Sequence, residues 1–234
     1  MDTDTRNWSG RTLKQRVLEL LKSADFDLAL GELSRLPGRK VVNPLFSFLC
    51  SNDEEIRWRA VTALGAVVAN LASKDMESAR VIIRRLMWNL NDESGGIGWG
   101  SPEAMGEILA RHEGLAQEYA NILLSYARED GNYLEHEILQ RGLLWGIGRL
   151  AQVRPDLVKD AAPYLTQYMK SPDETVRGLA AWIMGLLGVV EAGPALERLM
   201  EDNAVLQSYI GRILTGLGAK QACVNSFGIL NSPG

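Results

Sequence analysis

The sequence predicts an all-α protein of about five helix pairs, and three observations lead to this expectation. Apolar residues recur at helical spacing along most of the chain, and one short segment returns in several copies. No stretch alternates polar and apolar residues as a half-buried strand would. The 234 residues are 46% hydrophobic with a net charge of −4, so the chain can bury a sizeable core.

Residues 1–38 are expected to form an N-terminal pair of capping helices. In the segment RTLKQRVLELL, Leu13, Val17 and Leu20 share one face of a helix. Asp25 can cap a second helix, which should end before Pro37.

Two segments, DEEIRWRAVTALG and DETVRGLAAWIMG, carry the repeat most clearly. Counted from Ile56 and Val176 as origins, both have aspartate at −3, arginine at +1, alanine at +4 and glycine at +9. These shared positions are Asp53, Arg57, Ala60 and Gly65 in the first copy, and Asp173, Arg177, Ala180 and Gly185 in the second. Weaker copies start at Ile97, Leu139 and Val205. Positions 0, +4, +7 and +8 lie on one side of a helix, which predicts the buried face.

The breaks between segments predict where helices begin. Ser73 should start a long helix that reaches Leu90, and residues 130–132 should interrupt the chain. The last stretch, 217–234, should be a C-terminal cap and tail. The helices that carry the repeat are expected to begin near Glu54, Pro102, Tyr133 and Pro172.

The pattern D-x-x-V-R-x-x-A-x-x-A-L-G, preceded by amphipathic segments such as VVNPLFSFL, resembles the HEAT repeat over residues 40–216. The likeness is greatest to the bacterial phycobilin-lyase variety of this repeat. The resemblance implies a right-handed α-α superhelix, a HEAT/armadillo-like solenoid forming a single domain over 1–234. Each repeat would be an A helix followed by a B helix, and the B helices would line the concave side. The resemblance implies protein binding more than chemistry, and no cofactor is expected.

Composition and charge exclude several classes of protein. The 29 acidic residues outnumber the 25 basic ones, so the charge does not indicate a nucleic-acid-binding protein. No apolar run is long enough to span a membrane, and the polar N-terminus is unlike a signal peptide, so a cytoplasmic protein is expected. Cys50 and Cys223 lack metal or disulfide spacing, and we expect free thiols in the core.

The histidines do not predict a catalytic or metal site. A di-iron family of helical-repeat proteins places His-Glu pairs at +2 and +3 of each B helix. Here the pairs His112-Glu113 and His136-Glu137 fall at non-equivalent repeat positions. A catalytic triad needs a nucleophile with a positioned base, usually histidine. With two histidines and no nucleophile-elbow motif, the sequence does not predict such a triad. No metal site and no catalytic residue are predicted.

A glycine-rich segment replaces the usual entry to one B helix. It has the sequence SGGIGWG and lacks the preceding strand and the following lysine of a phosphate loop. One interpretation is a permissive connection in a lengthened repeat. The other is a ligand loop that favours a cation, an amide or a basic peptide, formed by Asp92, Glu93, Gly95, Gly96 and Gly98.

Tryptophans are the main candidate for a binding surface. Trp58 and Trp99 occupy +2, and Trp145 and Trp182 occupy +6, which lie opposite the buried stripe of a helix. Glu103 and Arg141 share these positions. Aromatic anchors beside an arginine are typical of binding hot spots. The alternative is that the rings are contacts between neighbouring B helices, because tryptophan is usually mostly buried.

Three functions remain open from the sequence. The first is a non-catalytic scaffold that binds a protein or peptide in a Trp-lined concave groove, with Arg141 and Glu103 fixing polar groups. The second is a phycobilin-lyase-like enzyme or chaperone for a tetrapyrrole or similar flat cofactor. The third is an assembly subunit whose tryptophans belong to the core. We take the first as the main hypothesis.

Overall fold

A computed structural model describes residues 9–91 and 98–189. The chain divides into two compact units, residues 1–119 and 120–234, and each is described by itself. The described residues form helices and contain no strand, as the sequence predicts. The predicted repeat boundary at 216 and the predicted cap over 217–234 lie outside the described residues. The organisation as one domain therefore stays a prediction.

The described part of unit 1 is a series of helices. Their bounds are α1 Gly10–Leu21, α2 Phe26–Arg35, α3 Gly38–Leu49, α4 Glu54–Ala72, α5 Met76–Leu90 and α6 Ser101–Arg111, followed by α7 Glu113–Ser125, which crosses into unit 2. Side-chain oxygens of Ser9, Asp25, Asp53 and Asp75 accept hydrogen bonds from backbone N–H groups at the starts of α1, α2, α4 and α5. These caps satisfy N–H groups that a helix cannot satisfy internally.

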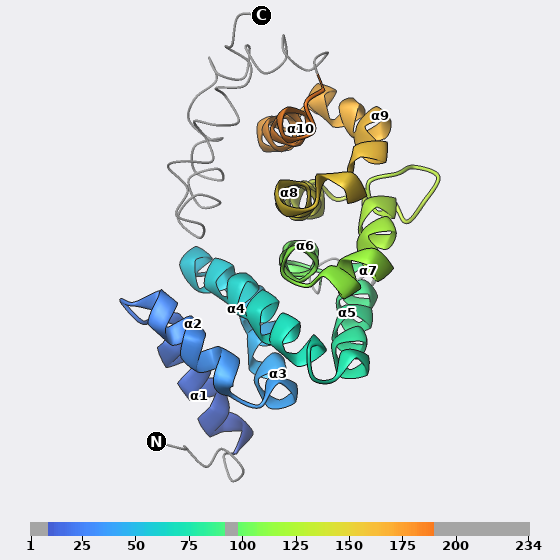
Figure 1. The fold of residues 1–234 in the computed structure, drawn as a ribbon. Helices are drawn as coiled ribbons and strands as arrows, with labels where there is room; N and C mark the ends of the chain where they lie inside the picture. Colours follow the sequence, from blue (N-terminus) through green and yellow to red (C-terminus); the bar gives the residue numbers. More distant parts are fainter. Residues whose placement is uncertain (1–8, 92–97, 190–234) are drawn as a thin grey trace, which may run out of the picture. The chain divides into compact units, whose positions relative to one another are not determined.

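The core of unit 1 lies between the A helices and the B helix α4. Helix α4 packs against α3 on one side and against α6 on another (Figure 1). Leu45 and Leu49 of α3 and Leu64 of α4 are fully buried. Since α4 contacts α2, α3, α5 and α6, it is the central element of this unit.

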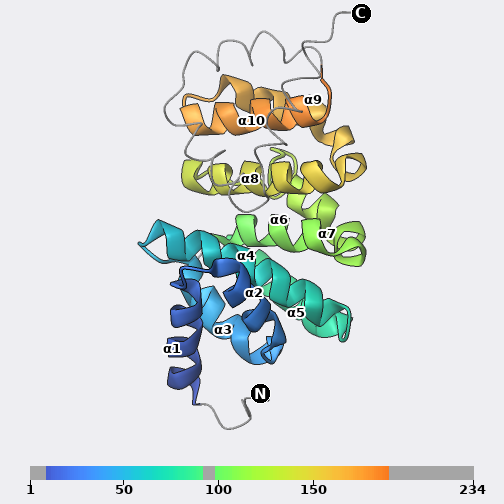
Figure 2. The same cartoon turned by 60° about the vertical axis from the view of Figure 1, so that its left-hand side comes forward.

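Unit 2 contains two B helices that lie side by side (Figure 2). These are α8, Glu137–Val153, and α10, Glu174–Leu186. Between them the A-helix position is broken into short pieces: η2 Pro155–Leu157, η3 Lys159–Ala161, α9 Ala162–Leu165 and η4 Thr166–Lys170. The hydroxyl of buried Tyr168 in η4 donates to the carbonyl of Ala127 at 3.0 Å, which ties this broken segment to the end of α7.

The structure gives the repeated aspartate a physical role. Asp53 and Asp173 cap α4 and α10, and their carboxylates accept from the N–H groups of Ile56 and Val176 at 3.2 and 2.9 Å. Ile56, Leu139 and Val176 are buried as predicted, and Ile97 lies outside the described residues. In α4 and α10 the repeat therefore combines an N-cap with a buried residue three positions later.

Several predicted helix starts differ from the observed ones. Helix α4 begins at Glu54 as expected, α6 begins at Ser101 and α10 at Glu174. Helix α8 begins at Glu137 rather than near Tyr133, because His136 is its N-cap. The prediction of a helix from Ser73 was also wrong, since Ser73 ends α4 and Asp75 caps α5.

The prediction of core thiols was wrong for Cys50. This residue ends α3, and its side chain is exposed because the chain turns away from the core there. Cys223 lies outside the described residues.

Enlarging the repeated alanine should test the packing of the B helices. Ala60 and Ala180 have no exposed surface. Ala60→Leu or Ala180→Leu should lower the free energy of unfolding by about 1–3 kcal/mol, because extra methylene groups overpack a filled core. Chemical denaturation measures the change. An unchanged midpoint in both variants would contradict the assigned buried face.

Candidate functional site

The face of α4 that carries Trp58 also carries Gly65, two helical turns further on. A Cβ atom on Gly65 would lie 2.4 Å from Cγ of Glu107, so the stem of this α6 side chain fits against the glycine. Trp58 itself is half-buried. The space beside the +9 glycine of α4 is therefore filled by a side chain of the neighbouring helix α6.

A glycine of unit 2 also accommodates a side chain of a neighbouring helix, and here that side chain is a tryptophan. A Cβ atom on Gly148 of α8 would lie 1.9 Å from Cζ3 of Trp182 in α10. The indole ring of Trp182 thus rests on the backbone of α8. Because Trp182 is only half-buried, part of the ring stays open to solvent.

Trp145 does not keep the accessible ring that the sequence predicts. Its side chain is 5% exposed and belongs to the core. Helix α8 is buried on all sides from Leu139 to Ala151 except at the half-buried Arg141. The apolar periodicity of α8 therefore does not indicate which side of this helix is exposed to solvent.

Trp99 lies outside the helix to which its repeat position assigns it. Residues 98–100 form a turn, and α6 begins only at Ser101. Gly100 adopts a φ of 75°, where a Cβ would come within 2.9 Å of the carbonyl oxygen of Leu49. Trp99 is consequently held near the end of α3, where the thiol of Cys50 donates to its carbonyl oxygen at 3.9 Å, and its side chain is 36% exposed.

The candidate ligand loop is described only at its end. Gly98 is buried in the turn before α6. The other predicted loop residues, Asp92, Glu93, Gly95 and Gly96, lie outside the described residues.

Arg141 joins two B helices. Its guanidinium group pairs with both carboxylate oxygens of Asp173, with Nε donating at 3.2 and 3.1 Å. Burial acts to raise the pKa of Asp173, but hydrogen bonds from Arg141 and from the N–H groups of Val176 and Thr175 outweigh it, so the pKa lies below its usual value. Arg141 therefore strengthens the cap that starts α10.

Glu103 is a buried carboxyl group in the first turn of α6. Among the residues that the structure describes, its Oε2 atom has no hydrogen-bond partner, and neither has the buried hydroxyl of Ser101, two residues earlier. Burial raises the pKa of Glu103 to about 7, although its own backbone N–H and the charge of Arg57 on α4 act in the opposite direction. The carboxyl is therefore partly neutral near pH 7.

Both histidines cap helices. Nδ1 of His112 accepts from the N–H of Leu115 at the start of α7, and Nδ1 of His136 accepts from that of Ile138 at the start of α8. Within residues 9–91 and 98–189, no cluster of three histidine, cysteine or carboxylate side chains could hold a metal ion. In the same ranges, no helix is long and apolar enough to cross a bilayer.

The sequence analysis missed an exposed tryptophan on an A helix. Trp88 of α5 is 73% exposed, and Val81 on the same helix is 53% exposed. The buried residues of α5 are Ala79, Ile82, Ile83, Leu86 and Leu90. Their spacing places Val81, Arg85 and Trp88 on the outer face, so the helical period of this segment carried the signal.

Comparison with known proteins gives one family and one relative by sequence. A family model described as HEAT-like repeat matches residues 137–187. An uncharacterized protein of Archaeoglobus fulgidus is 30% identical over 175 residues, which cover 71% of this chain and 85% of that protein.

Solved structures of helical-repeat proteins are also similar. The karyopherin Kap121p, bound to the extreme C-terminus of the protein phosphatase Cdc14p, matches 90% of this chain with 25% of its own, at 17% identity and a TM-score of 0.52. A designed armadillo repeat protein in complex with peptide (KR)4 matches 87% of this chain with 98% of its own, at 19% identity and a TM-score of 0.47. The likeness to the karyopherin shows the fold alone. The chain belongs to the HEAT-like repeat family.

Proposed function

We propose that this protein is a non-catalytic scaffold whose B helices bind a segment of a partner protein. In unit 1 the proposed surface is the side of α4 that carries Trp58, and in unit 2 it is the side of α10 that carries Trp182. A helical-repeat fold supports such a role because its stacked repeats present a row of equivalent helix faces.

One observation carries the proposal: Trp58, Trp99 and Trp182 all keep exposed surface. A tryptophan that only filled the core would be covered, as Trp145 is. A partly open indole ring that rests on a neighbouring backbone, as that of Trp182 does, is suited to anchor a partner, since tryptophan and arginine are enriched in binding hot spots. Arg141 lies on α8 with 36% of its side chain exposed, and its guanidinium group is held in place by Asp173.

The karyopherin comparison supports the proposal at the level of the fold. That protein holds the C-terminus of another protein. Fold likeness alone does not fix function, so the argument rests on the tryptophans. No residue of the described ranges favours the tetrapyrrole alternative, and the visible absorbance of the purified protein tests it separately.

The proposal includes action in the cytoplasm. The exposed thiol of Cys50 supports this location, because exposed thiols persist where the surroundings are reducing.

Crosslinking from the tryptophan positions tests the proposed surface. A photoreactive amino acid at position 58 or 182 should capture one partner segment in native cells, identified by mass spectrometry. Trp58→Ala and Trp182→Ala should each weaken binding of that isolated segment at least tenfold, because a few aromatic anchors carry most of an interface. Affinity is measured by calorimetry.

The matched control is Leu28→Ala, which removes an equally prominent apolar side chain that is 76% exposed on α2. This variant should bind the segment as the unchanged protein does. Unchanged binding by both tryptophan variants, with circular dichroism showing that they are folded, would refute the surface.

A further inference from the structure

The outer side of unit 1 carries cations and an exposed aromatic ring on its A helices. We propose that this face of α1, α3 and α5 is a second binding surface, which takes an acidic segment of a protein. It lies on A helices and uses none of the tryptophans assigned to the B-helix surface, so it goes beyond the function proposed above.

A pocket between α1 and α3 forms the first part of this surface. Its volume is about 470 Å³, and Lys14, Arg39 and Lys40 line it, together with the amide of Asn43. Leu13 provides an apolar wall, and no carboxylate side chain is among the lining residues. Arg39 is already paired with Asp75, the cap of α5, so Lys14 is the cation that makes the pocket complementary to a carboxylate group.

The surface continues from the pocket to α5. Nη1 of Arg85 donates to Oδ1 of Asn43, a lining residue of the pocket, at 2.6 Å. The guanidinium group of Arg85 also lies 4.1 Å from the centre of the Phe46 ring on α3. These two contacts fix Arg85 beside the pocket and keep its charge at the surface.

Two exposed apolar side chains flank Arg85 on the same helix. Val81 precedes it by one turn and Trp88 follows it by one turn, with 53% and 73% of their surfaces exposed. Tryptophan is highly buried on average in folded proteins, so its exposure here beside Val81 and Arg85 is a feature that a partner can use. An incoming segment could thus place an apolar residue on Trp88 and a carboxylate on Arg85.

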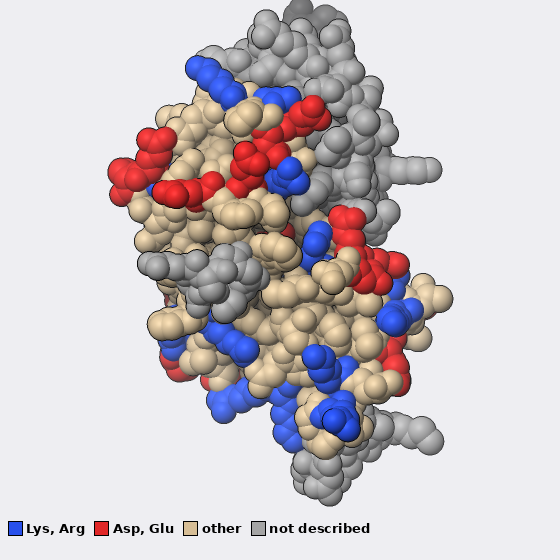
Figure 3. Space-filling view, turned by 180° about the vertical axis from the view of Figure 1, so that it is seen from behind, with Lys and Arg blue, Asp and Glu red and all other residues tan. Residues whose placement is uncertain are grey.

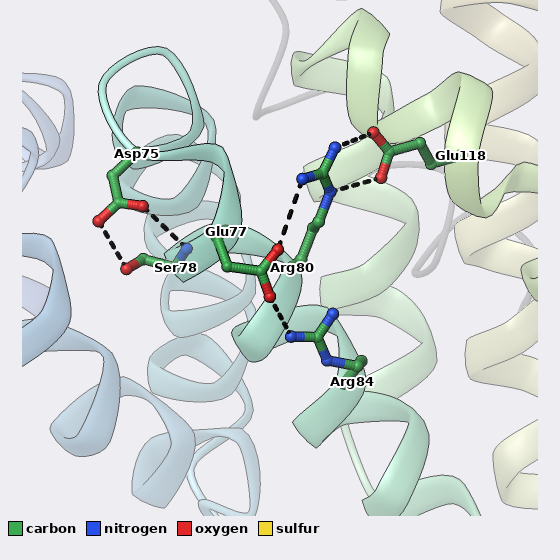
Figure 4. A network of polar contacts seen from close by, with 6 residues as sticks. All are labelled: Asp75, Glu77, Ser78, Arg80, Arg84 and Glu118. Atoms are coloured by element: carbon green, nitrogen blue, oxygen red, sulfur yellow. Dashed lines mark hydrogen bonds and ion pairs between the residues drawn. The ribbon is translucent and has the colours of Figure 1, made fainter.

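The charges around this surface are not equivalent. Figure 4 shows that Arg80 is paired with Glu118 on α7 and that Glu77 pairs with Arg80 and Arg84. Those arginines are already neutralised by carboxylates. Lys14, in contrast, lies over the Phe48 ring, and no carboxylate of the described residues pairs with it or with Arg85. Their charges are available to a ligand.

The mixture of charges favours an acidic protein segment over a nucleic acid. Figure 3 shows Lys and Arg side chains gathered over the N-terminal helices, with Asp and Glu side chains among them. The whole chain has a net charge of −4, and the arginines paired with Asp75, Glu77 and Glu118 are not available to a continuous phosphate backbone. A short peptide needs only to place its carboxylates on the pocket and on Arg85.

Three fluorescein-labelled probes test the proposal on the full chain. One is a glutamate-rich peptide with a central phenylalanine, the second replaces its glutamates with lysines, and the third is single-stranded DNA. Fluorescence anisotropy should show binding of the acidic peptide that weakens as salt is added, at least tenfold weaker binding of DNA, and none of the basic peptide.

Charge reversal and truncation then locate the site. The double variant Lys14→Glu, Lys40→Glu and the single variant Trp88→Ala should each weaken binding of the acidic peptide at least tenfold. Lys74→Glu and Leu28→Ala, which change an exposed cation and an exposed apolar side chain elsewhere on unit 1, should leave it within twofold. All four sets of changes are at exposed positions, so unchanged thermal midpoints are expected.

Several results would overturn this second surface. They are failure of the acidic peptide to bind, equal binding of DNA, or equal loss in the Lys74→Glu control. Trp58→Ala should leave binding of the acidic peptide unchanged. The B-helix surface and this surface can therefore fail independently.

Discussion

Gly148→Ala is expected to lower the free energy of unfolding by about 1–3 kcal/mol, although alanine is the better helix former by about 1 kcal/mol. The added methyl group would lie 1.9 Å from Cζ3 and 2.5 Å from Cε3 of Trp182. Both are atoms of a rigid ring, so the indole must leave the backbone of α8. Leaving removes much of the packing between α8 and α10. Urea unfolding followed by circular dichroism measures the loss.

A double variant separates this clash from other effects of the substitution. In a Trp182→Ala background the ring is gone, so Gly148→Ala should be neutral or stabilise by up to about 1 kcal/mol. Gly31→Ala is the matched single control, because Gly31 lies within α2 and a Cβ there would meet nothing within 4 Å. Equal effects of the alanine at positions 31 and 148 would mean that the ring does not rest on α8.

Glu103→Gln should stabilise the protein by up to about 3 kcal/mol at pH 8 and have almost no effect at pH 4. The unfolded chain ionises this carboxyl near its ordinary value, whereas burial raises the pKa in the folded protein to about 7. The folded state is therefore penalised increasingly as pH rises from about 4 to 7, and the penalty is constant above that range. Glutamine has nearly the same shape and carries no charge to desolvate. Denaturation at several pH values measures the difference.

Glu107→Gln is the control for this prediction because it should act in the opposite direction. Glu107 is also buried and lies one turn further along α6, but its Oε1 accepts from Nε of Arg111 at 2.5 Å. Removing its charge weakens an ion pair, which destabilises the fold. If Glu103→Gln also destabilised the protein at pH 8, the carboxyl of Glu103 would have to be ionised and paired in solution.

Local chemistry explains why much of the fold could be predicted from the sequence. Asp53 and Asp173 cap helices through atoms three residues away, and the apolar stripe that follows repeats at helical spacing. Both signals lie within one short segment. They locate α4 and α10 to within two residues.

The candidate site could be predicted only in part, because exposure depends on neighbouring elements. The helical angles of Trp58 and Trp182 correctly separate these residues from the buried stripe of their own helices. The same reasoning did not predict that Trp145 of α8 is buried. At Trp99 the angle had no meaning, since a turn around Gly100 replaces the helix. The ion pair between Arg141 and Asp173 joins residues that are far apart in sequence, so no local sequence pattern predicts it.

Two helix starts in this protein are supported by arginines that come earlier in the chain. Arg39 of α3 pairs with Asp75, the cap of α5, and Arg141 of α8 pairs with Asp173, the cap of α10. During synthesis each of these arginines leaves the ribosome before the helix whose start it supports. Helices α5 and α10 can therefore begin against an element that has already emerged.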